Sequence, residues 1–406
     1  MKDSTGASRL VTGYHDEKTG TAKMTSRERV LATLNHQEPD RVPVDIGGGG
    51  STTLVVEAYA KLKKLLGIQS DRTEILNETF RAARLDEQTL RRLGTDVRQL
   101  RTRSASRWTP PPSPAGASVD IWGVSWKKAF YGEGCFYWEL TGRPPLAEAR
   151  ISDLDRFPWP DPEDPGLTEG LAEEAKQLYD ETPYAVAADP VYKSFWEMAV
   201  RLRGFEQILM DVALDPQFVS ALLNKLLEIH LVATRRYLEA AGPYIQIVRV
   251  GDDLATQNGL LLSLDSYRRL VKPVQRRYFD LIHSQAQAKI YYHSCGNVTD
   301  LIDDLAEIGV DLLNPVQVSA MGDTTGLKAT FGHKMAFCGA IDTQRVLPFG
   351  TVQEVEAEVQ KRIRDLGPGG GFILAAVHNI QPDVPAENIL AMADAARKFG
   401  EYPLKG

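Results

Sequence analysis

The sequence predicts an α/β fold in which eight parallel strands close into a (β/α)8 barrel, a TIM barrel. The chain contains eight short runs rich in Val, Ile, Leu and aromatic residues, which is typical of strands buried on both faces. The later runs follow one another at about 25 to 50 residues, the spacing of strand–helix units. Helical patterns separate most of them, so eight repeats favour a closed barrel over an open doubly wound sheet.

The first helix is expected at TSRERVLATLNHQEP, because Thr25 and Glu28 have the spacing of a capping box. The polar stretch before it, residues 1–24, is predicted to be a mobile N-terminal extension. The expected strands are, in order, VPVDIG (42–47), DVRQL (96–100), YAVAAD (184–189), YIQIVRVG (244–251), KIYYHS (289–294), VDLLNPV (310–316), KMAFCG (334–339) and GFILAAV (371–377).

Two of the intervening helices are clear from their apolar periodicity. The pattern VTDLIDDLAEIG follows the fifth strand and ends at Gly309. The pattern TVQEVEAEVQKRIRDLG follows the seventh strand and ends at Gly367. Residues 103–150, rich in proline, glycine and alternating aromatic residues, are predicted to form a β-hairpin-like insertion after the second strand. No linker divides the chain, so residues 25–406 are expected to form one barrel domain.

Composition excludes several classes of function. The net charge is −7 and no long basic run occurs, which argues against nucleic acid as a partner. No apolar stretch could span a membrane, and the N-terminus lacks the apolar centre of a signal peptide. Three cysteines are too few for a disulfide framework and fit a reducing compartment. We therefore expect a cytoplasmic protein.

Candidate functional residues gather at the expected strand ends, where barrel active sites lie. They are His293 and Cys295 after the fifth strand, Cys338 at the end of the seventh, His378 after the eighth, Asp252 and Asp253 after the fourth, and Asp45 near the end of the first. Two thiolates and one imidazole supply three of the four ligands that zinc prefers, and a catalytic site keeps the fourth position exchangeable. Gly296 would allow His293 and Cys295 to reach one ion.

Each of these signals also has a simpler interpretation. An isolated cysteine is commonly a small buried hydrophobic residue, and a packed thiol is the favoured reading of Cys135. Asp252 and Asp253 could cap a helix or form a turn instead of binding a metal or acting as a base. The glycine loop IGGGGSTTL lacks the Gly-Lys-Ser/Thr ending of a phosphate-binding loop, so we interpret it as a close-packing or substrate-approach loop.

Four long segments resemble the uroporphyrinogen decarboxylase superfamily. They are TSRERVLATLNHQEPDRVPVD, HSCGNVTDLIDDLAEIGVDLLNPVQ, GAIDTQRVLPFGT and AAVHNIQPDVPAENI, and the resemblance extends from about Thr25 to Tyr402. It implies a (β/α)8 barrel. True decarboxylases carry R-Q-A-G-R after the first strand, and the corresponding DIGGGGSTTL contains no arginine to pair with a polyanionic substrate. His378 does match a histidine near the decarboxylase site.

The corrinoid-dependent methyltransferase branch fits the chain better. Its members resemble this sequence in an H-x-C pair followed by a distant cysteine, which bind zinc, and this implies His293, Cys295 and Cys338 as zinc ligands. Some relatives add an acidic ligand from the fourth strand end, for which Asp252 is the candidate. Asp252, Asp253, His378 and Asp45 are the candidate catalytic residues, and Asn297, Gln317 and Asn379 are expected to bind the cofactor.

The resemblance implies a zinc-dependent methyltransferase that moves a methyl group between a small methylated substrate and cobalamin. The sequence contains no D-x-H-x-x-G cobalamin-ligating motif, so a separate corrinoid protein is expected to carry the cobalamin. A methoxyaromatic substrate is favoured. Aromatic residues of the insertion could line its pocket or simply pack as a hairpin; they are Trp122, Trp126, Phe130, Tyr131, Phe136, Tyr137 and Trp138. The alternatives are a tetrapyrrole decarboxylase, a methylcorrinoid-to-thiol or tetrahydrofolate methyltransferase, and a non-catalytic barrel that binds a corrinoid or tetrapyrrole as a carrier or chaperone.

Overall fold

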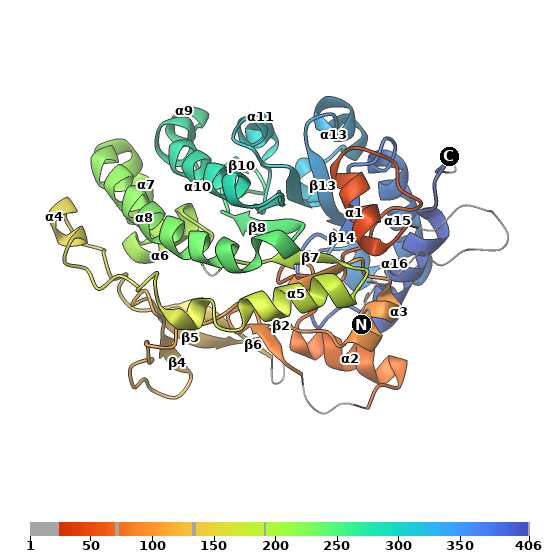
Figure 1. Ribbon diagram of the computed structural model, residues 1–406, viewed down its shortest axis with the longest axis horizontal. Helices are drawn as coiled ribbons and strands as arrows, with labels where there is room; N and C mark the ends of the chain where they lie inside the picture. The colour runs from red at the N-terminus through yellow and green to blue at the C-terminus, as the bar shows by residue number, and fades with distance from the viewer. Residues whose placement is uncertain (1–23, 70–72, 132–134, 191, 405–406) are drawn as a thin grey trace, which may run out of the picture.

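A parallel sheet forms the centre of the computed structural model, which describes residues 24–69, 73–131, 135–190 and 192–404 (Figure 1). The expected extension over residues 1–24 therefore lies, apart from Met24, outside the described residues. Seven strands pair in the order β14-β13-β12-β11-β8-β7-β3. Their bounds are β3 (Val97–Leu100), β7 (Ala185–Ala188), β8 (Ile247–Gly251), β11 (Lys289–His293), β12 (Leu312–Val316), β13 (Ala336–Ile341) and β14 (Phe372–Ala376).

The first predicted strand closes this sheet into a barrel. Val44 forms an isolated parallel bridge with Leu374 of β14, and the amide of Asp45 donates to the Leu374 carbonyl at 2.9 Å. On the other side, the amide of Asp96 donates to the Val44 carbonyl at 2.8 Å, just before β3. Residues 42–47 thus lie between the first and last strands of the sheet, and the predicted (β/α)8 barrel is confirmed.

The barrel interior is filled by its own side chains. They form a buried cluster that includes Ala185, Ala187, Ile247, Leu312, Ala336, Cys338, Ile373 and Ala375. Val30 and Leu34 of α1 (Ser26–Leu34) join this cluster, so α1 covers one end of the barrel. The side chain of Thr25 accepts a hydrogen bond from the Glu28 amide, and the predicted capping box is present.

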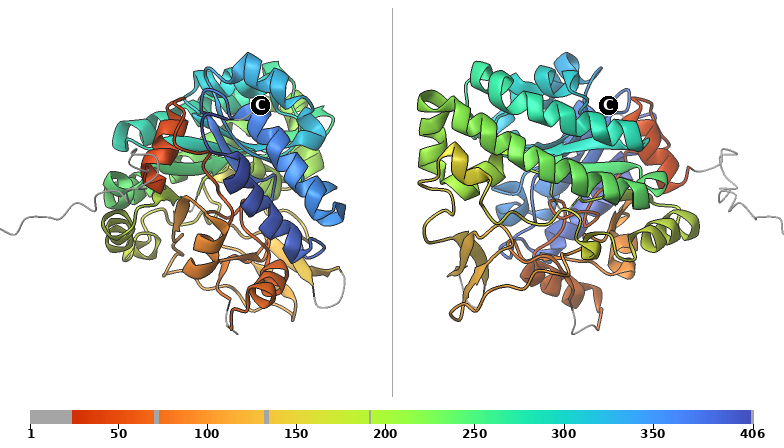
Figure 2. Two further views of the ribbon diagram at one scale, coloured as in Figure 1. Left: turned by 90° about the vertical axis from the view of Figure 1, so that its right-hand side faces the viewer. Right: turned by 60° about the vertical axis from the view of Figure 1, so that its left-hand side comes forward.

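Helices cover the outside of the sheet, and α8 and α10 run side by side along it (Figure 2). The outer helices are α2 (Val56–Leu66), α3 (Glu87–Leu93), α5 (Leu171–Glu181), α8 (Pro216–Ala241), α10 (Lys272–Gln285), α11 (Ile302–Glu307), α13 (Thr324–Phe331), α15 (Val352–Leu366) and α16 (Ala386–Phe399). Both helices predicted in detail are present as α11 and α15. In the described parts of the chain, no helix combines the length and apolar character needed to cross a membrane.

The remaining helices and strands occupy the connections. They are α4 (Ile151–Leu154), α6 (Trp196–Arg203), α7 (Phe205–Leu214), α9 (Leu264–Ser266), α12 (Val318–Met321), α14 (Val346–Phe349), β1 (Ile75–Asn77), β2 (Ala82–Ala83), β9 (Ala255–Thr256) and β10 (Gly259–Leu260). One turn of π-helix, Tyr267–Val271, leads into α10. Single 3-10 turns are Pro165–Leu167, Gly242–Tyr244 and Thr299–Leu301.

A separate antiparallel sheet stands between the second and third barrel strands. It consists of β4 (Ala117–Val119), β5 (Ser125–Phe130) and β6 (Phe136–Leu140), three strands where a hairpin was expected (Figure 1). Trp122 lies in the turn between β4 and β5 and is buried. This turn carries one aromatic side chain of the insertion toward the barrel.

Candidate metal centre at the barrel mouth

The turn that follows β11 carries the H-x-C pair. His293 is the last residue of β11, and Gly296 adopts a φ of 91°, a conformation that favours glycine. A Cβ atom at Gly296 would lie 2.5 Å from the carbonyl oxygen of Thr256, so the turn also needs glycine for its close approach to β9. These two constraints explain why a glycine directly follows Cys295.

Side chains from neighbouring strand ends hold this turn in place. The amide of Cys295 donates to Oδ1 of Asp253 at 2.8 Å, and the amide of Gly296 donates to Oε1 of Gln317 at 2.7 Å. The amide of Asn297 donates to the Thr256 carbonyl at 2.8 Å. The backbone of the turn that carries Cys295 is therefore held by three hydrogen bonds from different residues.

Three side chains meet at this turn with the donor atoms of a metal site. Nε2 of His293 lies 3.5 Å from Sγ of Cys295. Ligand atoms of His293, Cys295 and His378 all lie within 4.8 Å of one another, which makes them the one such group of His, Cys, Asp and Glu among the described residues. Zinc–nitrogen and zinc–sulfur bonds in a tetrahedral site place their donor atoms about 3.5 Å apart, so the spacing of His293 and Cys295 fits zinc, with His378 close enough to join them.

The electrostatics of this group favour one positive charge. Burial opposes charging of His293, but the neighbouring Cys295 and Asp253 and the hydrogen bond with Asn314 raise its pKa to about 10. Burial, reinforced by the charge of His293, lowers the pKa of His378 to about 4. His378 thus remains neutral and keeps a nitrogen lone pair available as a ligand.

Cys338 lies apart from this group. Strand β13 continues past it to Ile341, so its fully buried side chain packs inside the barrel with Ile247 and Tyr291 rather than at the strand end. Burial and the charge of Asp45 raise the pKa of its thiol above the ordinary range. The structure brings His378 to the place that the sequence assigned to Cys338.

Asp252 is also outside the group. Its Oδ1 accepts the amides of Phe195 at 2.8 Å and Glu197 at 3.1 Å, and its Oδ2 accepts Nε2 of Gln275 at 3.1 Å. Burial, together with the nearby Glu197, raises the pKa of Asp252 well above its ordinary value. Its oxygens hold the start of α6, which matches the helix-cap interpretation of this residue.

Asp45 forms an ion pair with an arginine, and the sequence alone did not predict this contact. Arg249 on β8 forms an ion pair with Asp45 at 2.8 Å, and both side chains are buried. Nη1 of Arg249 donates to the Gly48 carbonyl at 2.6 Å, and a Cβ at Gly49 would lie 2.1 Å from the same nitrogen. Gly48 and Gly49 therefore pack closely against Arg249, as one of the two interpretations expected, while Gly50 lines the pocket described below.

The three amide residues expected to bind a cofactor have different roles in the structure. Gln317 holds the metal-site turn, and Asn379 donates to the Gly50 carbonyl beside the glycine loop. Oδ1 of Asn297 accepts the amide of Thr299 at 3.2 Å and so starts the following helical turn. Of the three, Asn379 lines the pocket described next.

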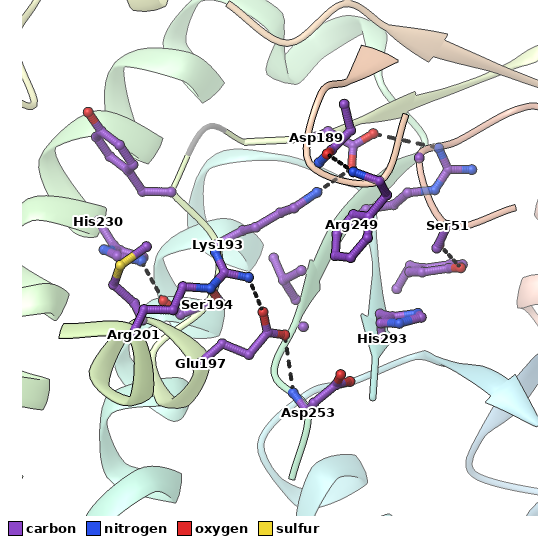
Figure 3. A pocket seen from close by; sticks show the side chains of 18 of the residues that line it. Ser51, Asp189, Lys193, Ser194, Glu197, Arg201, His230, Arg249, Asp253 and His293 are labelled. Carbon is purple, nitrogen blue, oxygen red and sulfur yellow. Dashed lines mark hydrogen bonds and ion pairs between the residues drawn. The ribbon is translucent and has the colours of Figure 1, made fainter. Parts of the chain in front are cut away.

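A pocket of about 310 Å³ opens beside the candidate metal ligands, and His293 and His378 line it (Figure 3). His293 and Asp253 lie on one side of it and His230 on the other. The Trp122 ring lies 6.2 Å from that of His230, so this indole forms part of the far wall. Of the seven aromatic residues considered in the insertion, Trp122 is the one among the pocket's lining residues.

Charged side chains between these ends are paired with one another. Arg201 donates to Glu197 at 2.9 Å, Lys193 contacts Asp189 at 2.7 Å, and Asp189 also faces Arg249 at 3.7 Å (Figure 3). The sequence did not point to these residues as a site. The available signals were the i, i+4 spacings of Glu197 with Arg201 and of Asp189 with Lys193, a pattern that is common on solvated helices.

The fold defines an α/β-barrel protein whose pocket lies beside a candidate metal site, and the comparisons with known proteins show its family. Residues 134–399 match the family described as uroporphyrinogen decarboxylase (URO-D). The chain belongs to this family.

The similar proteins carry two different names. A uroporphyrinogen decarboxylase from Pseudoalteromonas atlantica is 23% identical over 266 residues, covering 63% of this chain and 70% of that protein. One from Legionella pneumophila is 26% identical over 249 residues, covering 58% of this chain and 66% of its own. A solved structure, a methyltransferase from Methanosarcina mazei, has a TM-score of 0.62 and 19% identity, covering 93% of this chain and 99% of its own. At that identity the likeness shows the fold.

Proposed function

We propose that this protein is a zinc-dependent methyltransferase that moves a methyl group between a small methylated substrate and the cobalamin of a separate corrinoid protein. The observation that carries the proposal is the group of His293, Cys295 and His378, whose possible ligand atoms lie within 4.8 Å of one another beside a pocket. Three protein ligands are the number that catalytic zinc sites use, because the fourth position must exchange. The family and the methyltransferase fold are consistent with it.

The roles of the chain's own residues follow from their positions. His293, Cys295 and His378 would hold the zinc, and Asp253 and Gln317 keep the Cys295 turn from moving. Bound zinc would supply Lewis acidity toward an ether oxygen or lower the pKa of a thiol.

We favour a methoxyaromatic substrate because Trp122 and His230 form an aromatic wall opposite the metal group. In the demethylating direction the bond between the methyl carbon and the ether oxygen breaks, and the methyl group joins the cobalt of the partner's reduced cobalamin. The oxygen leaves with the electron pair of the broken bond and then takes up a proton. Transfer in the opposite direction, from a methylcorrinoid to a thiol or to tetrahydrofolate, would use the same metal group.

A tetrapyrrole decarboxylase is the alternative that the names of the curated relatives suggest. Its substrate carries many carboxylates and requires unpaired cations. In the described lining, Arg201, Lys193 and Arg249 each face a carboxylate of the protein, so the pocket offers a polyanion little charge. The pocket is also at the small end of the range for ligand sites.

A direct assay separates the two reactions. Zinc-loaded protein would be mixed with methoxyaromatic compounds and cob(I)alamin, and methylcobalamin would be followed by its visible spectrum and the phenol by chromatography. The proposal expects turnover by wild type and by Cys135→Ser, which alters a cysteine of the insertion, and loss of turnover in Cys295→Ser. Decarboxylation of uroporphyrinogen without methyl transfer would overturn the proposal in favour of the alternative.

A further inference from the structure

We infer that Asn314 sets the orientation and tautomer of His293, so that Nε2 presents its lone pair to the metal. This inference rests on the metal centre proposed above. It makes Asn314 a positioning residue, because it acts through His293 and does not itself belong to the ligand group.

The contact between the two side chains is built into the sheet. Asn314 on β12 is the register partner of His293 on the parallel strand β11. Asn314 is fully buried, with 0% of its surface exposed, and its Oδ1 lies 2.6 Å from Nδ1 of His293. The Asn314 carbonyl also accepts the amide of Ser294 at 2.8 Å. One residue therefore holds both the imidazole and the backbone that follows it.

The orientation of the Asn314 amide is fixed by a third strand. Nδ2 of Asn314 lies 3.4 Å from the carbonyl oxygen of Cys338 on β13. A carbonyl can only accept, so the amino end of the side chain must face Cys338 and the amide oxygen must face His293. An amide oxygen likewise only accepts, which requires a proton on Nδ1 of His293.

The tautomer then determines which nitrogen can bind a metal. With Nδ1 protonated, a neutral His293 carries its lone pair on Nε2, the nitrogen 3.5 Å from Sγ of Cys295. Partners of this kind fix the ring of a ligating histidine, and their loss typically weakens metal binding about 10- to 100-fold. Cys338 thus contributes to the metal centre through its backbone carbonyl, two strands away from His293.

Two substitutions test this assignment by metal affinity. Asn314→Leu removes the acceptor with little change in shape, and its zinc affinity is expected to fall about 10- to 100-fold. Asn314→Asp keeps an oxygen toward Nδ1 and is expected to retain the affinity. The measurement is competition with a chromophoric chelator, with the visible spectrum of the cobalt(II)-loaded protein as a second readout.

A matched control separates positioning from general stability. Asn388 on α16 is also a buried asparagine, and its Nδ2 donates to the carbonyls of Leu347 at 2.9 Å and Gly350 at 2.8 Å. Asn388→Leu is expected to lower stability while leaving zinc affinity and the cobalt(II) spectrum unchanged. For a readout that needs no variant of Asn314, two-bond ¹H–¹⁵N spectra of zinc-loaded wild type are expected to show His293 bound through Nε2 and protonated at Nδ1.

The outcomes distinguish the inference from the function on which it rests. Equal affinities and spectra in wild type and Asn314→Leu, equal losses in Asn314→Leu and Asn314→Asp, or a His293 bound through Nδ1 would overturn the inference and leave the metal centre standing. A wild-type protein that binds neither zinc nor cobalt(II) would overturn the metal centre itself.

Discussion

The sulfur of Cys295 lies 3.5 Å from Nε2 of His293, whereas Cys338 is fully buried within the barrel. The two cysteines therefore differ both in access to solvent and in the charge of their surroundings.

This difference predicts how the cysteines react. In metal-free native protein, Cys295 should be alkylated by iodoacetamide, while Cys338 should react only after unfolding, because burial keeps its thiol protonated. Zinc should slow the reaction of Cys295 and leave that of half-buried Cys135 unchanged. Peptide mapping by mass spectrometry measures all three rates. Alkylation of native Cys338 as fast as Cys295 would show that the thiol is not enclosed.

The glycine loop offers a stability test with a neighbouring control. Gly49→Ala places a methyl group 2.1 Å from Nη1 of Arg249, whose guanidinium is buried against Asp45. Displacing that pair should lower the free energy of unfolding by about 2–4 kcal/mol. A Cβ at Gly50 meets no atom within 4 Å, so Gly50→Ala should change the free energy of unfolding by less than about 0.5 kcal/mol. Chemical denaturation compares the two, and similar losses would contradict the role of Arg249.

The sequence predicted the barrel well because its strands are buried on both faces and form continuous apolar runs. The capping box at Thr25 and the helix that ends near Gly309 follow from local rules and were likewise predicted. Residues 42–47 form a single β-bridge instead of a full strand. How much of this segment becomes a strand depends on its pairing with β14 and with the residues before β3. Local sequence carries no information about that pairing.

The site was predicted less completely, since its geometry depends on register. His293 and Cys295 are two positions apart in the sequence, so the motif alone predicted that they lie close together. The burial of Cys338 depends on how far β13 extends, and the contact of Asn314 with His293 depends on the parallel register of β11 and β12. The pair of Arg249 and Asp45 joins residues 204 positions apart, which no periodicity links.

The aromatic wall predicts a substrate effect that is separate from metal binding. Trp122→Leu should lower kcat/KM for a methoxyaromatic substrate about tenfold or more and leave the zinc content unchanged, because the indole faces the pocket but not the metal ligands. Trp138 serves as the control because it is not among the pocket's lining residues; the centre of its ring lies 6.3 Å from that of Phe136 on the same strand, β6. Trp138→Leu should therefore leave kcat/KM unchanged. Steady-state kinetics distinguish the two, and equal effects would place the substrate elsewhere.

His230 predicts a pH dependence of stability. Burial lowers its pKa from 6.5 to about 4, so the unfolded chain takes up a proton at a higher pH than the folded protein does. The contribution of His230 to the free energy of unfolding is fully present above about pH 6.5. It decreases by up to about 3 kcal/mol as the pH falls toward 4. Its Nε2 lies 3.0 Å from the Ser194 carbonyl, a contact that glutamine can imitate.

The variant His230→Gln isolates that contribution. Denaturation from pH 7 to pH 4 should show a shallower loss of stability in the variant than in wild type. Identical slopes would indicate that His230 titrates normally in the folded protein.

The most direct test of the metal centre is zinc content, measured by plasma mass spectrometry on untagged wild type, Cys295→Ala and Cys338→Ala. The proposed metal centre predicts about one zinc per chain in wild type and in Cys338→Ala, and none in Cys295→Ala, because Cys295 would supply a ligand atom and Cys338 would not. Loss of zinc from a folded Cys338→Ala protein, or no zinc in reconstituted wild type, would contradict the proposed ligand set of His293, Cys295 and His378.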